Sequence, residues 1–490
     1  MTHLTDLPAE ILVVIGGFIR SLNSMRAAIL TCRHLHQHLA PLLWKRITVS
    51  DQTYPFGAKA DALKSHAHLV YRLNYAGYLD LGYYDISFPH LTSLMLLVSS
   101  EIEGRSPQEL DTLWSRLLLL NPTVRDIDIF AFTRIYLKDF WDAVFTSLHY
   151  PRQLIIDGAQ MHVAIDDEDT KAFWKACSRF EEIDYNGRDQ AVTSWGFMNY
   201  DYSQLTRLRY NTVDFTFPGS AQVEWVGKCR SLRKLHWECE AGLIPLQRFT
   251  ALAQNSTWPL LEDLCLGGTS GADEQFSAIL QHLPSLKHWT LKSGDFGPTS
   301  IAQLRDRHFI SLTTLRMPKV STFTSRMALE VLSSCSQLEV FEARRISLED
   351  FGLFPQPWAC RRLRRLVVFF SMADNKDNNE ANSLLFEQLS RLEQLEEIDV
   401  SQTTRYGSDY KLIYEPAPQW RLDHGLAQLS TLTRLWRLTC DSTKQDMRIE
   451  DVEWMLAHWP LLRRFSWLVS LDTHTQKLIS AKLKKRGIFT

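Results

Sequence analysis

Residues 261–266 read LEDLCL, residues 286–291 read LKHWTL and residues 312–317 read LTTLRM. Each hexapeptide contains an apolar residue, two free positions, an apolar residue, one free position and a third apolar residue. We call this pattern the strand frame; it also begins at Leu232, where residues 232–237 read LRKLHW. Alternation of apolar and free positions over so short a segment is typical of a β-strand with one buried face. We therefore predict a strand in each of these segments.

The strand frame recurs along most of the chain. Further frames begin at Leu91, Val124, Phe180, Leu205, Leu338, Leu363, Leu395 and Leu462, with weaker ones at Val70, Pro151 and Leu432. From Phe180 to Leu363 successive starts are 25, 27, 29, 25, 26, 26 and 25 residues apart. Three loosely defined apolar positions also coincide by chance, so this regular spacing is the stronger observation. It indicates stacked structural repeats, whose period is commonly about 20–50 residues.

Cysteine and proline mark the step into the strand. Cys177, Cys229, Cys335 and Cys360 each lie three residues before a frame start, and a proline lies two residues before five other starts. A small thiol fits under the end of a helix, and proline stops a helix before the strand. The pattern resembles the cysteine-containing leucine-rich repeat. The asparagine usual at the ninth place of that repeat is missing, which predicts irregular turns and curvature.

The segments between the frames have helical periodicity. In residues 324–332, for example, Met327, Leu329 and Leu332 are spaced to face inward. A strand and a helix cannot bury their apolar sides alone, but stacked units share one continuous core. We predict an α/β fold, a leucine-rich-repeat solenoid with a curved parallel sheet and outer helices. It would comprise about 14–15 irregular repeats over residues 49–490, lengthened by polar loops at 371–382 and 401–420.

Composition excludes several classes of function. The 490-residue chain has a net charge of −2, which gives no field for attracting nucleic acid or a membrane surface. No apolar stretch approaches the length of a transmembrane helix. The eight cysteines lack a CxxC pair and are expected to be reduced thiols in a cytoplasmic and/or nuclear protein. No phosphate loop, GxSxG or HExxH motif occurs. We therefore expect no catalytic residues, no metal and no cofactor, and a protein that is not an enzyme.

Residues 4–18 read LTDLPAEILVVIGGF and do not follow the repeat. A secretory signal is not expected, because no basic residue precedes the apolar run and Asp6 and Glu10 flank its start. Pro8 is placed to begin a helix, with Glu10 in its first turn. We expect two more short helices, around residues 26–31 and over residues 33–42.

Residues 7–47 resemble the F-box, a helical module, over the stretch LPAEIL…I…LTCRHLHQHL…PLLWKRI. The resemblance implies an F-box module at residues 1–48 and the substrate-recognition subunit of an SCF-type cullin–RING ubiquitin ligase. The module would bind a Skp-type adaptor, and through it a cullin, while the solenoid binds a protein substrate. The residues implied in adaptor binding are Leu7, Pro8, Ile11, Leu12, Ile15, Leu30, Cys32 and Trp44. The sequence departs from the family at Leu35, where an aromatic residue is common, and at the helix-weakening pair Gly16 and Gly17.

The same residues have an alternative interpretation. The amino-terminal helices would then only cap the open first repeat of a protein-interaction scaffold that works outside any ligase. Trp44, Ile47 and Val49 fit the strand frame, so Trp44 is placed to serve either role.

A substrate site is predicted on the sheet. In a leucine-rich solenoid the free positions of the strand frame point to the concave face. These positions are acidic at residues 126, 128, 181, 182 and 184, and then basic at Arg207, Arg209, Lys234 and His236. Neighbouring strands lie about 5 Å apart, so these four side chains would form a cationic patch suited to an acidic or phosphorylated peptide. The alternative is that charges on successive strands pair with each other. The sequence does not identify the substrate, and it does not indicate whether the two polar loops take part in binding it.

Overall fold

The computed structural model describes residues 7–19, 21–50, 59–76, 81–98, 107–131, 137–158, 168–187, 199–212, 219–239, 244–354, 356–372, 378–402, 416–441, 443, 445–466, 469–470 and 472–489. The chain forms two compact units, Met1–Gly242 and Leu243–Thr490, which we call unit 1 and unit 2. Each is built from strands that alternate with helices. Among the described residues no helix combines the length and the apolarity needed to cross a bilayer.

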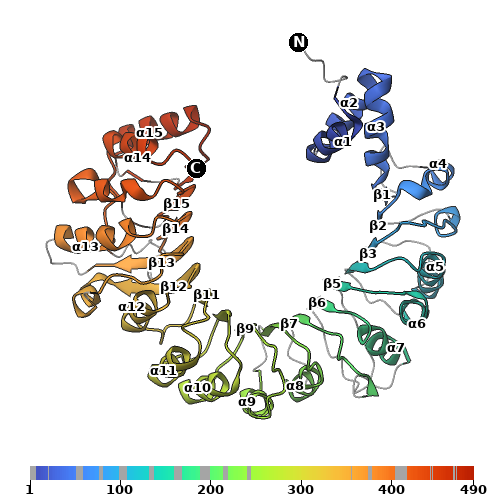
Figure 1. The fold of residues 1–490 in the computed structure, drawn as a ribbon, viewed down its shortest axis with the longest axis horizontal. Helices are drawn as coiled ribbons and strands as arrows, with labels where there is room; N and C mark the ends of the chain where they lie inside the picture. Colours follow the sequence, from blue (N-terminus) through green and yellow to red (C-terminus); the bar gives the residue numbers. More distant parts are fainter. Residues whose placement is uncertain are drawn as a thin grey trace. The chain divides into compact units, whose positions relative to one another are not determined.

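Unit 1 begins with three short helices and continues as parallel strands in chain order. Its helices after β2 lie on one side of the strands (Figure 1). The elements are α1 (Ala9–Phe18), α2 (Leu22–Thr31), α3 (Arg33–Trp44), β1 (Arg46–Ser50), α4 (Ala60–Ser65), η2 (Ala67–Leu69), β2 (Arg72–Ala76), η3 (Leu81–Tyr83), β3 (Ser93–Val98), α5 (Pro107–Leu120), β4 (Asp126–Ala131), α6 (Lys138–Ser147), β5 (Gln153–Asp157), α7 (Glu168–Cys177), β6 (Glu182–Gly187), β7 (Arg207–Thr212), α8 (Gly219–Lys228) and β8 (Lys234–Cys239).

Unit 2 repeats the same plan, with its helices again on one side of the strands (Figure 1). The elements are α9 (Leu246–Gln254), β9 (Asp263–Gly267), α10 (Asp273–His282), β10 (His288–Leu291), α11 (Pro298–Arg307), β11 (Thr314–Met317), α12 (Ser325–Ser334), β12 (Val340–Ser347), η5 (Leu348–Leu353), β13 (Arg365–Ser371), α13 (Asn378–Ser390), β14 (Glu397–Asp399), η6 (Leu422–His424), η7 (Leu426–Thr431), β15 (Arg437–Thr439), α14 (Ile449–His458), β16 (Arg464–Phe465) and α15 (Thr473–Lys485).

The strand frame predicts the core correctly. In the frame that begins at Leu232, Leu235 and Trp237 lie on β8 and all three side chains are fully buried. Leu235 pairs in register with Leu208 of β7, so equivalent frame positions stack from strand to strand. The predicted α/β solenoid of parallel strands and one layer of helices is therefore confirmed. The weaker frames at Val70 and Pro151 also precede strands, β2 and β5.

One predicted frame is wrong. Ile398 of β14 pairs with Leu438 of β15, which places the frame start at Leu435 instead of Leu432. Leu432 directly follows the 3-10 helix η7, as its C-cap, and its side chain is buried there. Because leucines three residues apart are both buried, one at the helix end and one before the strand, the sequence alone favoured the wrong start.

The cysteine and helix predictions are confirmed. Cys177, Cys229, Cys335 and Cys360 are buried next to the step from helix to strand. Helix α12 covers the predicted segment, and its inward residues include the three predicted ones. The first polar loop is shorter than predicted, because Ser371 ends β13 and α13 begins at residue 378. Residues 373–377 and 403–415 of the two loops lie outside the described residues.

The three predicted amino-terminal helices are present. Pro8 precedes the first residue of α1, the Ser21 hydroxyl accepts a hydrogen bond from Ser24 N at 3.4 Å before α2, and Cys32 Sγ accepts one from Leu35 N at 3.5 Å before α3. Only Lys45 separates α3 from β1, which is paired with β2 from Arg46 to Ser50. The three-helix unit therefore leads directly into the sheet of unit 1.

Candidate protein-interaction surfaces

The three-helix unit buries little of its apolar surface. Its core consists of Leu12, Met25, Leu35 and Leu39, with partly buried side chains packed around them. Large apolar side chains remain exposed on α1 and α2, namely Ile11, Val13, Val14, Ile15, Phe18 and Leu30. Large exposed apolar side chains in this number on two short helices are typical of a protein-interaction site. We call these six residues the apolar face.

The predicted adaptor-binding residues fall into two groups. Ile11, Ile15 and Leu30 are 46%, 37% and 81% exposed, and Pro8 is also exposed where α1 begins. These four are accessible to a partner.

The other four support the fold of unit 1. Leu12 is buried at the centre of the three helices, and Leu7 and Cys32 pack against that core. The Trp44 ring stacks on His66 with 4.0 Å between ring centroids, at the junction with the first repeat. Val13, Val14 and Phe18 were not predicted, although the continuous apolar run in residues 11–15 was a signal that α1 has an uncovered side.

A glycine allows α1 to lie close to α3. A Cβ atom at position 16 would come within 2.6 Å of Leu42 Cδ1 and 2.7 Å of Leu39 Cδ2. At position 17 a Cβ would meet nothing within 4 Å. A larger residue at position 16 would therefore have to displace two leucine side chains of α3, whereas one at position 17 would meet open space.

The four residues of the predicted cationic patch lie side by side. Arg207 pairs in register with Lys234, and Arg209 pairs with His236, on β7 and β8. The two guanidinium groups are also bound to the preceding strand, because Arg207 lies 3.5 Å from Glu182 and Arg209 lies 3.5 Å from Asp184. The patch is compact as predicted, but its arginines are partly neutralised by the acidic side chains of β6.

Ion pairs continue across the sheet face of unit 1. Arg72 of β2 contacts Asp128 of β4 at 3.1 Å, and Arg152 binds both oxygens of Asp126 at 2.9 Å. Burial raises the pKa of Asp128 even though Arg72 acts in the opposite direction. Most charges on this face are therefore paired with one another.

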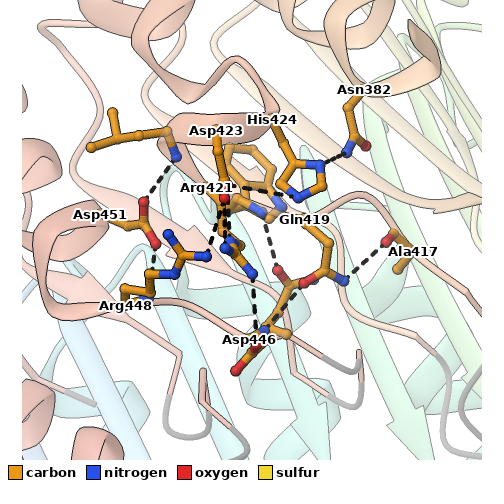
Figure 2. A network of polar contacts seen from close by, with 12 residues as sticks. Asn382, Ala417, Gln419, Arg421, Asp423, His424, Asp446, Arg448 and Asp451 are labelled. Carbon is orange, nitrogen blue, oxygen red and sulfur yellow. Dashed lines mark hydrogen bonds and ion pairs between the residues drawn. The ribbon is translucent and has the colours of Figure 1, made fainter. Parts of the chain in front are cut away.

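In unit 2 a network of charged side chains holds the chain around η6 (Figure 2). Arg421 binds both oxygens of Asp423, at 2.6 and 3.0 Å, and lies 3.6 Å from Asp446. Arg448 also contacts Asp423 at 3.3 Å. Asp451 accepts a hydrogen bond from Leu422 N at 2.8 Å, which ties this segment to α14. These three carboxylates already bind arginine or backbone donors. The network therefore holds the segment around η6 in place and is not a candidate ligand site.

The described part of the chain holds no metal-ligating cluster, and its buried thiols are protonated. No group of three His, Cys, Asp or Glu side chains is placed there to hold a metal ion. The cysteines are thiols, and burial raises the pKa of Cys360 and of Cys440 to about 12. A thiol with so high a pKa is a poor nucleophile.

Comparison with known proteins gives similarity of fold only. No family model and no curated protein matches the sequence. The crystal structure of a TLR13–ssRNA13 complex matches 87% of this chain with 14% sequence identity and a TM-score of 0.42, and this chain spans only 58% of that one. The crystal structure of the Rad7 and Elc1 complex in yeast matches 97% of each chain with 11% identity and a TM-score of 0.42. Likeness at this level says nothing of the partners or activity of this chain.

Proposed function

We propose that this chain is a non-catalytic receptor subunit of an SCF-type ubiquitin ligase. Its amino-terminal helices would act as an F-box that docks on a Skp-type adaptor, and its solenoid would hold a protein substrate. The observation that carries the proposal is the apolar face. The three helices place four side chains in their core and expose six large apolar ones, which is more than an isolated helical unit of this size tolerates without a partner.

The test is co-expression of the native chain with a Skp-type adaptor, followed by size-exclusion chromatography. Val14→Asp places a charge on the apolar face at a residue that is 57% exposed, so it leaves the helical core intact. If the proposal is right, the native chain forms a stoichiometric complex and Val14→Asp weakens it at least about 30-fold, the effect of losing an interface anchor worth about 2 kcal/mol.

Ile310→Asp is the matched control, because Ile310 is an exposed isoleucine (84%) in unit 2. It should bind the adaptor like the native chain. The proposal fails if the native chain does not bind the adaptor, or if both variants bind equally well.

A second candidate function is a scaffold whose helices only cap the sheet. The stack of Trp44 on His66 and the direct step from α3 into β1 favour it. Deleting residues 1–43 separates the two functions. Loss of a cap lowers the melting temperature and exposes apolar surface, whereas loss of a docking module leaves the repeats folded and abolishes adaptor binding.

A further inference from the structure

A groove of about 320 Å³ lies in unit 1, at the amino-terminal ends of strands β2, β3, β4 and β5. Its main lining residues are Tyr71, His90, Pro122, Arg125, His149 and Tyr150, and we call it the rim groove. These residues lie just before β2, β3, β4 and β5, so equivalent positions of four successive repeats build it. It is separate from both the apolar face and the cationic patch, and nothing about it depends on the proposed function.

The backbone beneath the rim groove is held by the sheet. The Tyr71 carbonyl accepts hydrogen bonds from Thr92 N at 2.9 Å and Ser93 N at 3.1 Å. The Thr92 carbonyl accepts one from Arg125 N at 2.9 Å, and the Arg125 carbonyl accepts one from Arg152 N at 2.7 Å. Because these backbone groups already bond to one another, they hold the groove in a preformed shape and are not available to a ligand.

Two exposed tyrosines flank the groove. Tyr71 is 41% exposed, stacks on His90 with 5.7 Å between ring centroids and lies 5.6 Å from Lys45 Nζ. Tyr150 is 76% exposed and contacts His149 edge-on at 6.5 Å. Tyrosine supplies a large contact area at low conformational cost, which is why it is common among interface anchors.

The rim groove is lined by a basic side chain and by no acidic one. Its ionisable side chains are Arg125, two histidines and two tyrosines, and no carboxylate lines it. Arg125 is exposed, and within the described residues its guanidinium has no hydrogen-bond or ion-pair partner. Arg72 and Arg152, on the adjacent sheet face, are by contrast paired with aspartates. Arg125 is therefore available for a carboxylate supplied by a ligand.

We propose that the rim groove binds an extended acidic segment of a partner protein. A carboxylate of that segment would accept hydrogen bonds from Arg125, and the residues on either side would pack against Tyr71 and Tyr150. Nucleic acid fits less well, because a backbone-binding site needs several cations in a row and Asp126 and Asp128 lie on the adjoining strand β4.

The test is selection of a phage-displayed random dodecapeptide library on the full-length protein, followed by fluorescence anisotropy of the selected peptides. We expect peptides in which aspartate or glutamate stands beside aromatic residues or proline. Arg125→Met and Tyr150→Ala should each raise their Kd about tenfold or more, the effect of losing a charge-assisted hydrogen bond or an anchor. Replacing the acidic residues by their amides should do the same.

Arg230→Met is the matched control. Arg230 is an exposed arginine that lies two residues before the frame start of β8. His149 of the rim groove occupies the equivalent position before β5. Arg230→Met therefore removes the same charge as Arg125→Met, but from a different repeat. Its Kd should stay within twofold of the native value. The proposal is overturned if the selected peptides are not acidic, if no peptide depends on Arg125, or if Arg230→Met weakens binding as much as Arg125→Met. A single-stranded oligonucleotide that binds in an Arg125-dependent way and displaces the peptides would assign the groove to nucleic acid instead.

Discussion

His308 is fully buried in unit 2, between α11 and the strand β11. Its Nδ1 accepts a hydrogen bond from Leu286 N at 3.1 Å, and its Nε2 lies 3.0 Å from the Leu280 carbonyl, to which it donates. These partners fix the neutral ring, and burial lowers its pKa to about 4. A buried histidine of this kind joins neighbouring repeats and has no exposed proton to exchange with a substrate.

This geometry predicts that acid destabilises the protein through His308. Above pH 6.5 the His308 ring is neutral in both the folded and the unfolded protein. Below pH 6.5 the unfolded chain takes up a proton first, so the free energy of unfolding falls until the pH reaches about 4. Between pH 7 and pH 5 the loss should be about 2 kcal/mol. Urea unfolding at the two pH values should show a correspondingly smaller loss for His308→Gln. Equal losses in both proteins would contradict the prediction.

At the scale of residues, the sequence indicated which side chains belong to the candidate surfaces better than it indicated which of them are exposed. Helix α1 is apolar on nearly every side, so the pattern could not separate buried Leu12 from exposed Val14. The cationic patch shows the same limit. The strand frame placed Arg207 beside Lys234, but the ion pair that Arg207 makes with Glu182 depends on side-chain geometry across strands.

Neighbouring helices of unit 2 are joined by a carboxylate. Asp273, the first residue of α10, accepts hydrogen bonds at the start of α11 from Gly297 N and Thr299 N, both at 2.8 Å, and from Ser300 N at 2.9 Å. Burial alone would raise the pKa of Asp273, but the hydrogen bonds from Ser300 and Thr299 outweigh it and hold the pKa at about 2. One repeat thus caps the helix of the next.

Removing this cap should destabilise unit 2. Asp273→Ala leaves the first N–H groups of α11 without their acceptor and should lower the free energy of unfolding by about 1–2 kcal/mol. Asp306→Ala, an exposed aspartate of α11 paired with Arg305, is the control and should change stability by less than about 0.5 kcal/mol. Denaturant titration of both variants measures the difference. A similar effect of the two substitutions would show that Asp273 is not a cap.

At the scale of elements, the spacing of apolar residues predicted the strands well because each strand buries one face in every repeat. It failed at Leu432, where a helix end and a strand start both bury leucine. It also gave no indication of Asp273 as a cap, since the helix that it caps lies one repeat later in the chain. Local sequence determines where elements form, and contacts between repeats determine how they are joined.

Across the whole molecule, seven of the eight cysteines are buried and only Cys32 is partly exposed. Burial raises the pKa of Cys177 in unit 1 and of Cys360 in unit 2, where the pKa reaches about 12. Protonated and shielded thiols react slowly with alkylating reagents.

Thiol labelling should therefore report unfolding of separate repeats. In native buffer an alkylating reagent should modify Cys32 rapidly and leave the buried seven unmodified, whereas all eight react in denaturant. Mass spectrometry of peptides after pulses at increasing urea concentration would show which cysteines become accessible first. Rapid modification of Cys360 in native buffer would contradict the burial described here.

The repeated spacing also made the solenoid predictable over both units. The rim groove could not be predicted in the same way. Tyr71, Arg125 and Tyr150 occupy unremarkable positions next to the frame starts, and they form a groove only because successive repeats stack side by side. A surface assembled from several repeats leaves no continuous motif in the sequence.

The connection between α3 and β1 has a consequence for orientation. A single residue, Lys45, joins them, Trp44 stacks on His66 beside the junction, and β1 is paired along its length with β2. With no loop to act as a hinge, a protein docked on α1 would be carried at a fixed angle to the first strands. A second protein in the rim groove would then face it from a constant direction. If the chain has the proposed ligase function, the lysines of that second protein within reach of transfer would be selected by geometry as well as by affinity.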